Sequence, residues 1–435
     1  MRIRSTLSAA ATLGAVALLA TGCLSSGGGG GGGSKNTSNS IEIAYAFTGT
    51  QADNFVAVMN DWAKQNNITL KLTPTPSFES VITTRVQSNQ LPDIAMFPQV
   101  GIMANIAKQG KLADLSGVLN SGDTSQFVQG ALDVGKVNGK QYAFPYGINV
   151  KSTVYYPKSI EQQAGLANPP QTFADLQALT DKVAATGTTP WCLGIEAGSS
   201  TGWPMTDWVE NLMLIDYGPD VYNQWVQHQI PFNDQKVLDV LNQIQNLVLK
   251  DGNVNGGRGS IATNNFGTAG NPMFDNPPGC YMYRQGNFLT QKGFFPDAVV
   301  NNLDKSVGIF PMPGKTAGDK PVLGGGDLAG LFSQNNDSAK KALQYIASAD
   351  FGNALAKRGG YLSPRKDTDM SAYPDDTTRQ FANIAYQSTT FVFDGSDQMP
   401  GAVGSGSFWK EMTAWVAGQE DAKTALDNIE ASWPK

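Results

Sequence analysis

Strand-like and helix-like segments alternate between residues 41 and 97, and this alternation constrains the fold more than any other feature of the sequence. Residues 41–47 (IEIAYAF) have the composition of a buried strand, and the apolar residues of 55–62 then recur at helical spacing. Two further strand-like runs, 68–72 and 93–97, are separated by a helical stretch. Because strands joined by crossover helices pair in parallel, this order predicts an α/β fold.

The loops that follow these three strands are the first candidates for a binding edge. In open parallel sheets, ligands lie at the carboxyl ends of the strands. Residues 48–53, 74–79 and 98–101 occupy that position. A second α/β pattern follows later in the chain, where Thr172 and Asp175 form a capping-box sequence that predicts the start of a helix.

The N-terminus has the pattern of a secretory signal. Arg2 and Arg4 precede an uncharged run at 7–20, which is too short to span a bilayer as a permanent helix. Small residues lead directly to Cys23, an arrangement similar to the lipobox at which a Cys is lipidated and the signal is cleaved. We predict a lipoprotein signal peptide at 1–22 and lipidation of Cys23. An ordinary secretory signal with a chance Cys is the alternative.

Residues 23–40 are predicted to form a flexible linker behind the lipid anchor. This segment contains seven consecutive glycines followed by small polar residues, so it cannot bury apolar surface. Such a tether would join a lipidated Cys23 to a folded domain. The predicted location is therefore extracytoplasmic, attached to the bacterial cell membrane through the lipid.

The two remaining cysteines, Cys192 and Cys280, form an even pair in a chain that is predicted to be exported. Disulfides persist outside the cytosol, so a bridge between them is favoured over two buried free thiols. A bridge that closes a loop of this length would contribute about 4 kcal/mol in the chain-entropy model.

Length and charge narrow the possible functions. Residues 41–435 are too many for one ordinary hydrophobic core, which suggests two lobes. The formal net charge is −6, and a mildly acidic protein is a poor partner for nucleic acid. Only 16% of the residues are charged, while Asn, Gln, Gly and aromatic residues are plentiful, which favours a neutral, hydroxyl-rich ligand.

A series of short motifs follows in a characteristic order and spacing. The motifs are LPDI (91–94), GKLADL (110–115), NGKQYAFP (138–145), VYYPK (154–158), AGL (164–166), PPQTFADL (169–176), YRQGNF (283–288), FPMP (310–313) and GGG (324–326). Together they resemble the extracellular sugar-binding proteins of bacterial carbohydrate ABC importers, known as sugar-binding family 1. Pro157 and Asn287 depart from the family pattern, which usually has Asn at the first position and often Trp at the second.

This resemblance implies a type II-like periplasmic-binding-protein fold, in which two α/β lobes are joined by a hinge and close on a ligand in the cleft between them. The implied lobes are 41–147 plus 307–360 and 148–306 plus 361–435, with crossings near Ile148, Ser306 and Tyr361. It also implies a monomer that hands a small saccharide to the permease subunits of an ABC importer. Neither enzymatic activity nor a cofactor is expected.

A second group of motifs is similar to the branch of the family that binds α-glucosides. These motifs are PWCLGIE (190–196), TGWP (201–204), Asp207 with Trp208, and NPPGC (276–280). The resemblance implies that the ligand is an α-glucoside or a small oligosaccharide. It also places Cys192 and Cys280 in one disulfide.

Candidate ligand-binding residues follow from the chemistry of a pyranose, which has an apolar C–H face and a rim of hydroxyl groups. Aromatic rings can stack on the face, and polar side chains can bond to the rim. The aromatic candidates are Phe47, Phe78, Tyr146, Trp203, Trp208 and Phe288. The polar candidates are Asp53, Glu79, Gln99, Glu196, Asp207, Asn287, Asp327 and Arg365, together with Gly325 and Gly326, which allow close backbone approach.

Each candidate also has a structural interpretation. Core packing is the alternative for the aromatic residues, most clearly for Trp208, which lies close to Val209 in a helical apolar pattern. An acidic first-turn residue is the alternative for Asp53, and an N-cap for Asp327. Arg365 could instead bridge the lobes near the hinge.

An exported glycoside hydrolase acting on oligosaccharides is the main alternative function, because such an enzyme needs only two suitably spaced carboxylates. A G-x-S-x-G pattern at 198–202, followed by Asp207 and His228, has the order of an esterase triad, but a Gly/Ser loop and a surface His explain it more simply. A structural or adhesive lipoprotein is the non-enzymatic alternative. One His and two pairable Cys offer no metal-ligand cluster, so no such metal site is expected. A structural calcium in the Asn- and Asp-containing loops is the alternative, although these loops have no recognisable calcium-binding signature.

Overall fold

The computed structural model of the chain describes residues 39–434. The predicted signal peptide at 1–22, the predicted lipidation site Cys23 and nearly all of the linker lie outside the described residues, so these predictions stay open. Within 39–434, no helix combines the length and the apolar character that crossing a bilayer requires.

A five-stranded mixed sheet contains the three strands that were predicted at the start of the chain. Its order is β2 (Thr69–Pro74), β1 (Ser40–Tyr45), β3 (Ile94–Phe97), β12 (Leu328–Leu331) and β6 (Ala143–Pro145). β1 pairs in parallel with both β2 and β3, as the alternation of strands and helices predicted. β12 is antiparallel to its neighbours β3 and β6.

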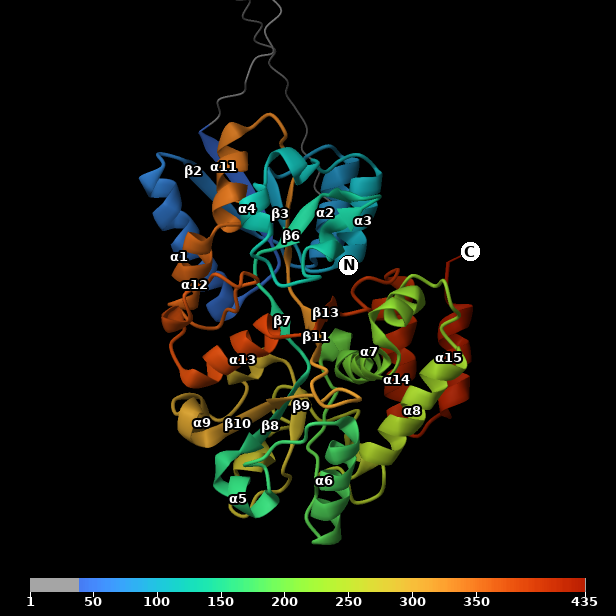
Figure 1. Cartoon of the computed structure of the whole chain (residues 1–435). Coiled ribbons are helices and arrows are strands. Elements are labelled where there is room, and N and C mark those ends of the chain that lie inside the picture. The colour runs from blue at the N-terminus through green and yellow to red at the C-terminus, as the bar shows by residue number, and fades with distance from the viewer. Residues whose placement is uncertain (1–38, 435) are drawn as a thin grey trace, which may run out of the picture. The chain divides into compact units, whose positions relative to one another are not determined.

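Helices cover both faces of this sheet (Figure 1). One face packs against α1 (Gly49–Gln65), α11 (Asp337–Ile346) and α12 (Ala349–Ala356), and the other packs against α2 (Phe78–Gln87) and α3 (Val100–Lys108). The alternation of strand side chains explains the two-sided core, because Ile94 and Met96 join the first face while Ala95 and Phe97 join the second. All four side chains are fully buried.

Two three-stranded sheets follow toward the other end of the molecule. In one, β8 (Thr153–Pro157) is central and antiparallel to both β10 (Val307–Pro311) and β9 (Tyr283–Gln285). In the other, β11 (Pro321–Gly325) is parallel to β13 (Thr390–Phe393) and antiparallel to β7 (Asn149–Val150). A small hairpin joins β4 (Lys136–Val137) to β5 (Lys140–Gln141).

The pairing of β10 corrects one expectation. The chain was expected to return to the first lobe near Ser306, so that residues from 307 onward would belong to it. Instead β10 pairs with β8, and the chain rejoins the five-stranded sheet only at β12. An extended segment such as β10 does not reveal its partner in the sequence, because either sheet could accept it.

Three segments cross between the five-stranded sheet and the rest of the fold, and they are hydrogen-bonded to one another. The Ile148 N–H donates to the carbonyl of Leu362 at 3.0 Å, and the Tyr146 N–H donates to the carbonyl of Asp327 at 3.2 Å. The three crossing segments thus run near Ile148, Asp327 and Tyr361. The exact lobe boundaries remain a prediction.

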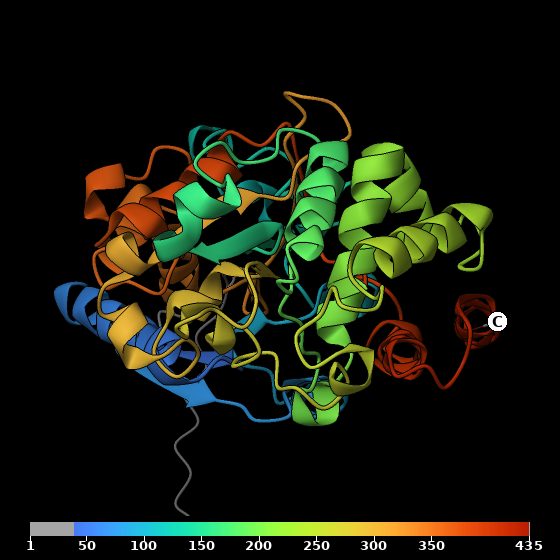
Figure 2. The same ribbon diagram turned by 90° about the horizontal axis from the view of Figure 1, so that it is seen from below.

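Helices account for most of the remaining chain. Their bounds are α4 (Ser121–Thr124), α5 (Glu161–Ala164), α6 (Phe173–Ala185), α7 (Trp203–Val226), α8 (Gln235–Leu247), α9 (Asp297–Val300), α10 (Leu303–Ser306), α13 (Asp376–Tyr386), α14 (Trp409–Val416) and α15 (Ala422–Ala431). The capping box predicted at Thr172 and Asp175 is present at the start of α6. Viewed from below, α14 and α15 (red) lie beside α7 and α8 (green), with which they share one core (Figure 2).

Candidate functional site

A pocket of about 510 Å³ opens where the crossing segments meet the loop that follows β1. Aromatic and polar side chains share its lining. The aromatic residues are Phe47, Tyr146, Phe288, Phe294 and Tyr361, and the polar ones are Thr48, Thr50, Gln51, Asn149, Gln291, Lys292 and Asp327. Its volume lies within the range of small-molecule sites, which are mostly apolar with a few placed polar groups.

Phe47 and Tyr146 form one aromatic wall of the pocket. Phe47 follows β1 and Tyr146 follows β6, so the ends of two strands in one sheet bring them together. Their ring centroids lie 5.3 Å apart, and Phe55 of α1 packs edge-on against Phe47 at 5.2 Å. Because these rings also belong to the core cluster under α1, the wall is held rigidly.

Gln51 and Asp327 supply polar groups beside this wall. The amide Nε2 of Gln51 lies 2.6 Å from the phenol oxygen of Tyr146 and 3.4 Å from Oδ2 of Asp327, and it donates to both. Burial raises the pKa of Asp327 to about 7, although the Gln51 bond acts in the opposite direction. A carboxyl group accepts hydrogen bonds from hydroxyl groups when it is ionised and can also donate one when it is protonated.

Gly326 is needed where the β11–β12 crossing passes the β6–β7 crossing. Its φ is +147°, and a Cβ atom built there would lie 2.3 Å from the carbonyl oxygen of Gly147. Glycine therefore permits this backbone conformation and this contact. Gly326 lines the pocket, whereas Gly325 pairs with Asn149 in the sheet, and a Cβ atom built on Gly325 would lie 3.3 Å from Cε of Lys151.

The segment after β9 supplies a further part of the lining, with Phe288, Gln291, Lys292 and Phe294. Phe288 lines the pocket, and Trp203, the first residue of α7, packs edge-on against it with centroids 5.9 Å apart. Phe266 also packs edge-on against Trp203 at 4.9 Å and lies 6.4 Å from Phe288, so the half-buried indole belongs to a cluster of three rings.

A second and larger cavity, of about 1040 Å³, lies between α3 and the segment 398–409. Glu79 and Gln99 line it, together with Trp409 and His228. The structure therefore brings these two predicted residues together, but in a different cavity from Asp327.

Comparison with known proteins decides the family. Residues 48–352 match the family described as bacterial extracellular solute-binding protein. This chain belongs to that family.

Two curated relatives match this solute-binding protein over nearly its full length. The osmoprotective compounds-binding protein GgtB of Synechocystis is 36% identical over 91% of this chain and 92% of its own. The alpha-glucosides-binding periplasmic protein AglE of Rhizobium meliloti is 33% identical over 87% of this chain and 83% of its own.

Solved structures confirm the predicted two-lobed α/β class. That of the bacterial solute receptor AcbH, described as preferring β-D-galactopyranose, superimposes with a TM-score of 0.75 at 18% identity. It covers 91% of this chain and 98% of that one. Family and relatives together make the chain a binding protein and not an enzyme, so the glycoside-hydrolase alternative is not supported.

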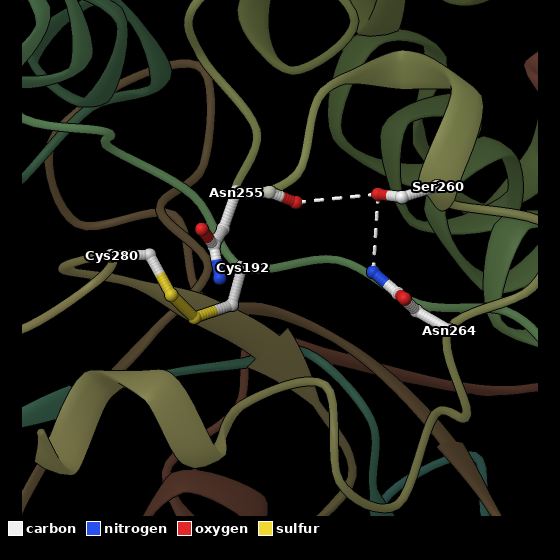
Figure 3. The surroundings of a disulfide bond; sticks show 5 residues. All are labelled: Cys192, Asn255, Ser260, Asn264 and Cys280. Atoms are coloured by element: carbon white, nitrogen blue, oxygen red, sulfur yellow. Dashed lines mark hydrogen bonds between the residues drawn. A yellow bond between two sulfur atoms is a disulfide. The ribbon is translucent and has the colours of Figure 1, made fainter.

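The disulfide that was predicted in this solute-binding protein is present. Cys192 and Cys280 are bonded with their Cα atoms 5.5 Å apart, within the normal range for disulfides. Figure 3 shows the bridge beside Asn255 and Ser260, whose hydroxyl accepts a 3.1 Å hydrogen bond from Asn264. The bridge fastens the long Gly- and Asn-rich loop to the base of β9, the strand that leads to Phe288.

Three predicted residues are buried in the solute-binding protein and do not reach the pocket. Trp208 packs edge-on against Trp191 in the core at 5.5 Å, which is the alternative that its spacing from Val209 suggested. Phe78 packs against Phe97. Arg365 is buried and pairs with Asp123 and Asp367, which corrects its placement at the ligand.

Four other predicted residues, Asn287, Glu196, Asp53 and Asp207, also lie outside the pocket lining. Asn287 is buried and accepts a 2.8 Å hydrogen bond from the Val150 N–H, so it fastens the β7 crossing. Glu196 accepts hydrogen bonds from the Gly198 N–H and from Asn265, which lower its pKa. Asp53 is exposed on α1.

Asp207, the last of the four, is fully buried and paired with Lys151. His228, the other residue of the esterase-like order, pairs with Glu430. The two therefore have separate partners, which excludes the triad interpretation.

Several residues that line the pocket were not predicted from the sequence. Gln51, Gln291, Lys292 and Phe294 belong to no recognisable motif, and amide or lysine side chains near a helix start are common on any surface. Gln51 lies within the loop 48–53 that was predicted as binding edge, so the topology pointed to its neighbourhood but not to the residue.

Proposed function

We propose that this solute-binding protein binds a small neutral saccharide, an α-glucoside or short oligosaccharide, and delivers it to the permease of an ABC importer. The observation that carries the proposal is the pocket itself. Phe288 and Phe294 are half-buried and offer ring surface to a pyranose, whereas Phe47 and Tyr146 are buried beside them. Gln51 and Asp327 offer hydrogen-bonding groups for the hydroxyl groups of the sugar. Such polar groups gain most when a ligand pairs all of them in a closed site.

Relatives support the choice of ligand class. The full-length similarity to an alpha-glucosides-binding protein favours an α-linked glucose unit. The similarity to an osmoprotective compounds-binding protein extends the candidates to osmoprotective compounds. An α-glucoside is neutral and rich in hydroxyl groups, in agreement with the aromatic and polar residues that line the pocket.

Delivery is proposed to depend on closure of two lobes about the three crossings. Because the crossings are few and short, rotation there would open the pocket without disturbing either core. We further propose a monomer that is held to the outer face of the membrane by a lipid on Cys23. Loss of metabolic labelling with a radioactive fatty acid in a Cys23→Ala variant would support the anchor, and unchanged labelling would exclude it.

A thermal-shift screen tests the function. Unfolding is followed with maltose, trehalose, sucrose, galactose and glycerol, each over a range of concentrations. A ligand that binds only the folded state adds about 2.7 kcal/mol at a hundredfold excess over its Kd, so a saturable rise in Tm with an α-glucoside is expected. A Tm that does not change with any of the saccharides would contradict the proposal. Glycerol is the control for non-specific stabilisation.

A further inference from the structure

Lys151 is held in place by carboxylates next to the pocket. It lies between β7 and β8, and its Nζ donates to Oδ1 of Asp207 at 3.1 Å and to the carboxylate of Asp394. Asp207 and Asp394 are buried. Burial alone would lower the pKa of Lys151, but the charges of Asp207, Asp394 and Asp397 outweigh burial and raise this pKa well above its ordinary value. The ammonium is therefore a permanent cation.

A second cation, Arg284 of β9, shares the same carboxylate but points into the core. Its side chain is 0% exposed, its Nη1 lies 3.7 Å from Oδ2 of Asp207, and its guanidinium lies over the buried ring of Trp208 at 5.5 Å. Oxygen atoms of Asp207, Glu210 and Asp394 lie within 4.8 Å of one another, a spacing that could hold a metal ion. Because the ammonium of Lys151 already bonds to two of these carboxylates, we assign no metal to this cluster.

Lys151 differs from Arg284 in what it faces. Its side chain is 12% exposed, and its Nζ lies 5.3 Å from the ring centre of the half-buried Trp203. The nearby residues Asn149 and Gly326 line the pocket, and the Cβ position of Gly325 lies 3.3 Å from Cε of Lys151. Lys151 and Trp203 are themselves outside the pocket lining, and the ammonium lies beside the half-buried indole, close in the chain to Asn149 of that lining.

One N–H of Lys151 is available to a ligand. An ammonium has three N–H donors, and among the described residues two of them have a hydrogen-bond acceptor, on Asp207 and Asp394. A buried ion pair seldom improves stability over an apolar pair, because desolvation opposes it. Desolvation makes the pairing of Lys151 with Asp207 and Asp394 unfavourable for stability. A role in ligand binding explains why the fold nevertheless keeps this ammonium group at a partly exposed position.

We propose that Lys151 is a ligand-binding residue, whose third N–H donates to an oxygen acceptor of a saccharide packed against Trp203. The inference rests on the proposed saccharide-binding function and adds a charged donor to it. A charge-assisted hydrogen bond is about twice as strong as a neutral one, so its loss should weaken binding measurably.

The test compares Lys151→Met with Arg284→Met, a matched control that removes the other cation bonded to Asp207. Maltose affinity is measured by calorimetry, with trehalose as the probe if maltose does not bind, and Tm is measured without sugar. We expect Lys151→Met to lower affinity at least about tenfold. Arg284→Met should lower Tm while the folded protein binds with unchanged affinity.

The inference is overturned if Lys151→Met binds the sugar as tightly as the wild-type protein. If Lys151→Met does not fold, the double variant Lys151→Met/Asp394→Asn replaces it, since it removes one carboxylate charge together with the ammonium, and the same two outcomes apply. A wild-type protein that binds no saccharide overturns the proposed function itself. If instead the wild-type protein and the Lys151 variant bind the sugar equally well, only the role of Lys151 is contradicted and the proposed function stands.

Discussion

The side-chain amide of Gln51 donates a 2.6 Å hydrogen bond to the phenol oxygen of Tyr146, across 95 residues of sequence. This bond joins the first turn of α1 to the end of β6, and the same amide lies 3.4 Å from Asp327 on a crossing segment. Through these two bonds the side chain of Gln51 connects the start of α1 with the end of β6 and with the β11–β12 crossing at the pocket.

Replacing Gln51 should weaken ligand binding more than it weakens the fold. Gln51→Ala removes the bonds to Tyr146 and Asp327 together with a polar group of the pocket lining, so we expect saccharide affinity to fall about tenfold, the effect of about one hydrogen bond. Calorimetry measures this. Gln65→Ala, at the exposed end of the same helix, should bind normally. Equal affinity of the Gln51 variant and the wild-type protein would remove this residue from the site.

A side chain at position 326 should destabilise the protein. Gly326→Ala places a Cβ atom 2.3 Å from the carbonyl of Gly147, in a backbone conformation that alanine rarely adopts. We expect the free energy of unfolding in urea to fall by about 1–3 kcal/mol. The control is Gly122→Ala, at an exposed position where a Cβ atom meets nothing within 4 Å and φ is not positive. Similar stability of the two variants would contradict the tight crossing.

Removal of the disulfide should destabilise the segment that supports Phe288. The double variant Cys192→Ser/Cys280→Ser frees a loop of 88 residues, and we expect a loss of about 2–4 kcal/mol in unfolding free energy. Reduction of the wild-type protein with dithiothreitol in denaturant should reproduce the loss. If both measurements leave the unfolding midpoint unchanged, the bridge does not contribute to stability.

The raised pKa of Asp327 predicts a pH-dependent stability. An unfolded Asp ionises near pH 4, whereas the folded carboxyl ionises near pH 7, so the folded state holds a proton that the unfolded state has released. This group therefore lowers stability progressively as the pH rises from about 4 to about 7.

Asp327→Asn should remove that dependence. The difference in unfolding free energy, variant minus wild type, should shift in favour of the variant between pH 4.5 and pH 7 in urea titrations. Asp53→Asn, an exposed carboxylate on α1, controls for the loss of one negative charge. A difference for Asp327→Asn that is the same at both pH values would show that this carboxyl ionises normally.

The sequence predicted the regular parts of the fold because their patterns are local. The alternation between residues 41 and 97 determined the parallel strands, and the capping box at Thr172 appeared as predicted. The prediction that the chain re-enters the first lobe near Ser306 was wrong, because β10 is a short apolar strand that either sheet could accept. Pairing partners of that kind depend on long-range packing, which no local pattern records.

The site was predictable only in part, for a similar reason. Phe47, Tyr146, Phe288 and Asp327 were identified because they follow strands or glycines, and the structure gathers them in one pocket. Trp203 and Trp208 stand five positions apart on one helix, so their side chains point in different directions, one toward Phe288 and the other into the core. Lys151 was not predicted as a site residue, because the two carboxylates that hold its ammonium lie more than 50 residues away in the sequence.

Calorimetric titration of the purified protein and of Phe288→Ala with α-linked disaccharides measures whether this pocket is the saccharide site. We expect saturable binding of one such sugar to the wild-type protein, with one site per chain, and an affinity at least about tenfold lower when the Phe288 ring is removed from the pocket lining. Saturable binding that is unchanged in Phe288→Ala would contradict the proposed site, because the sugar would then occupy another part of the molecule.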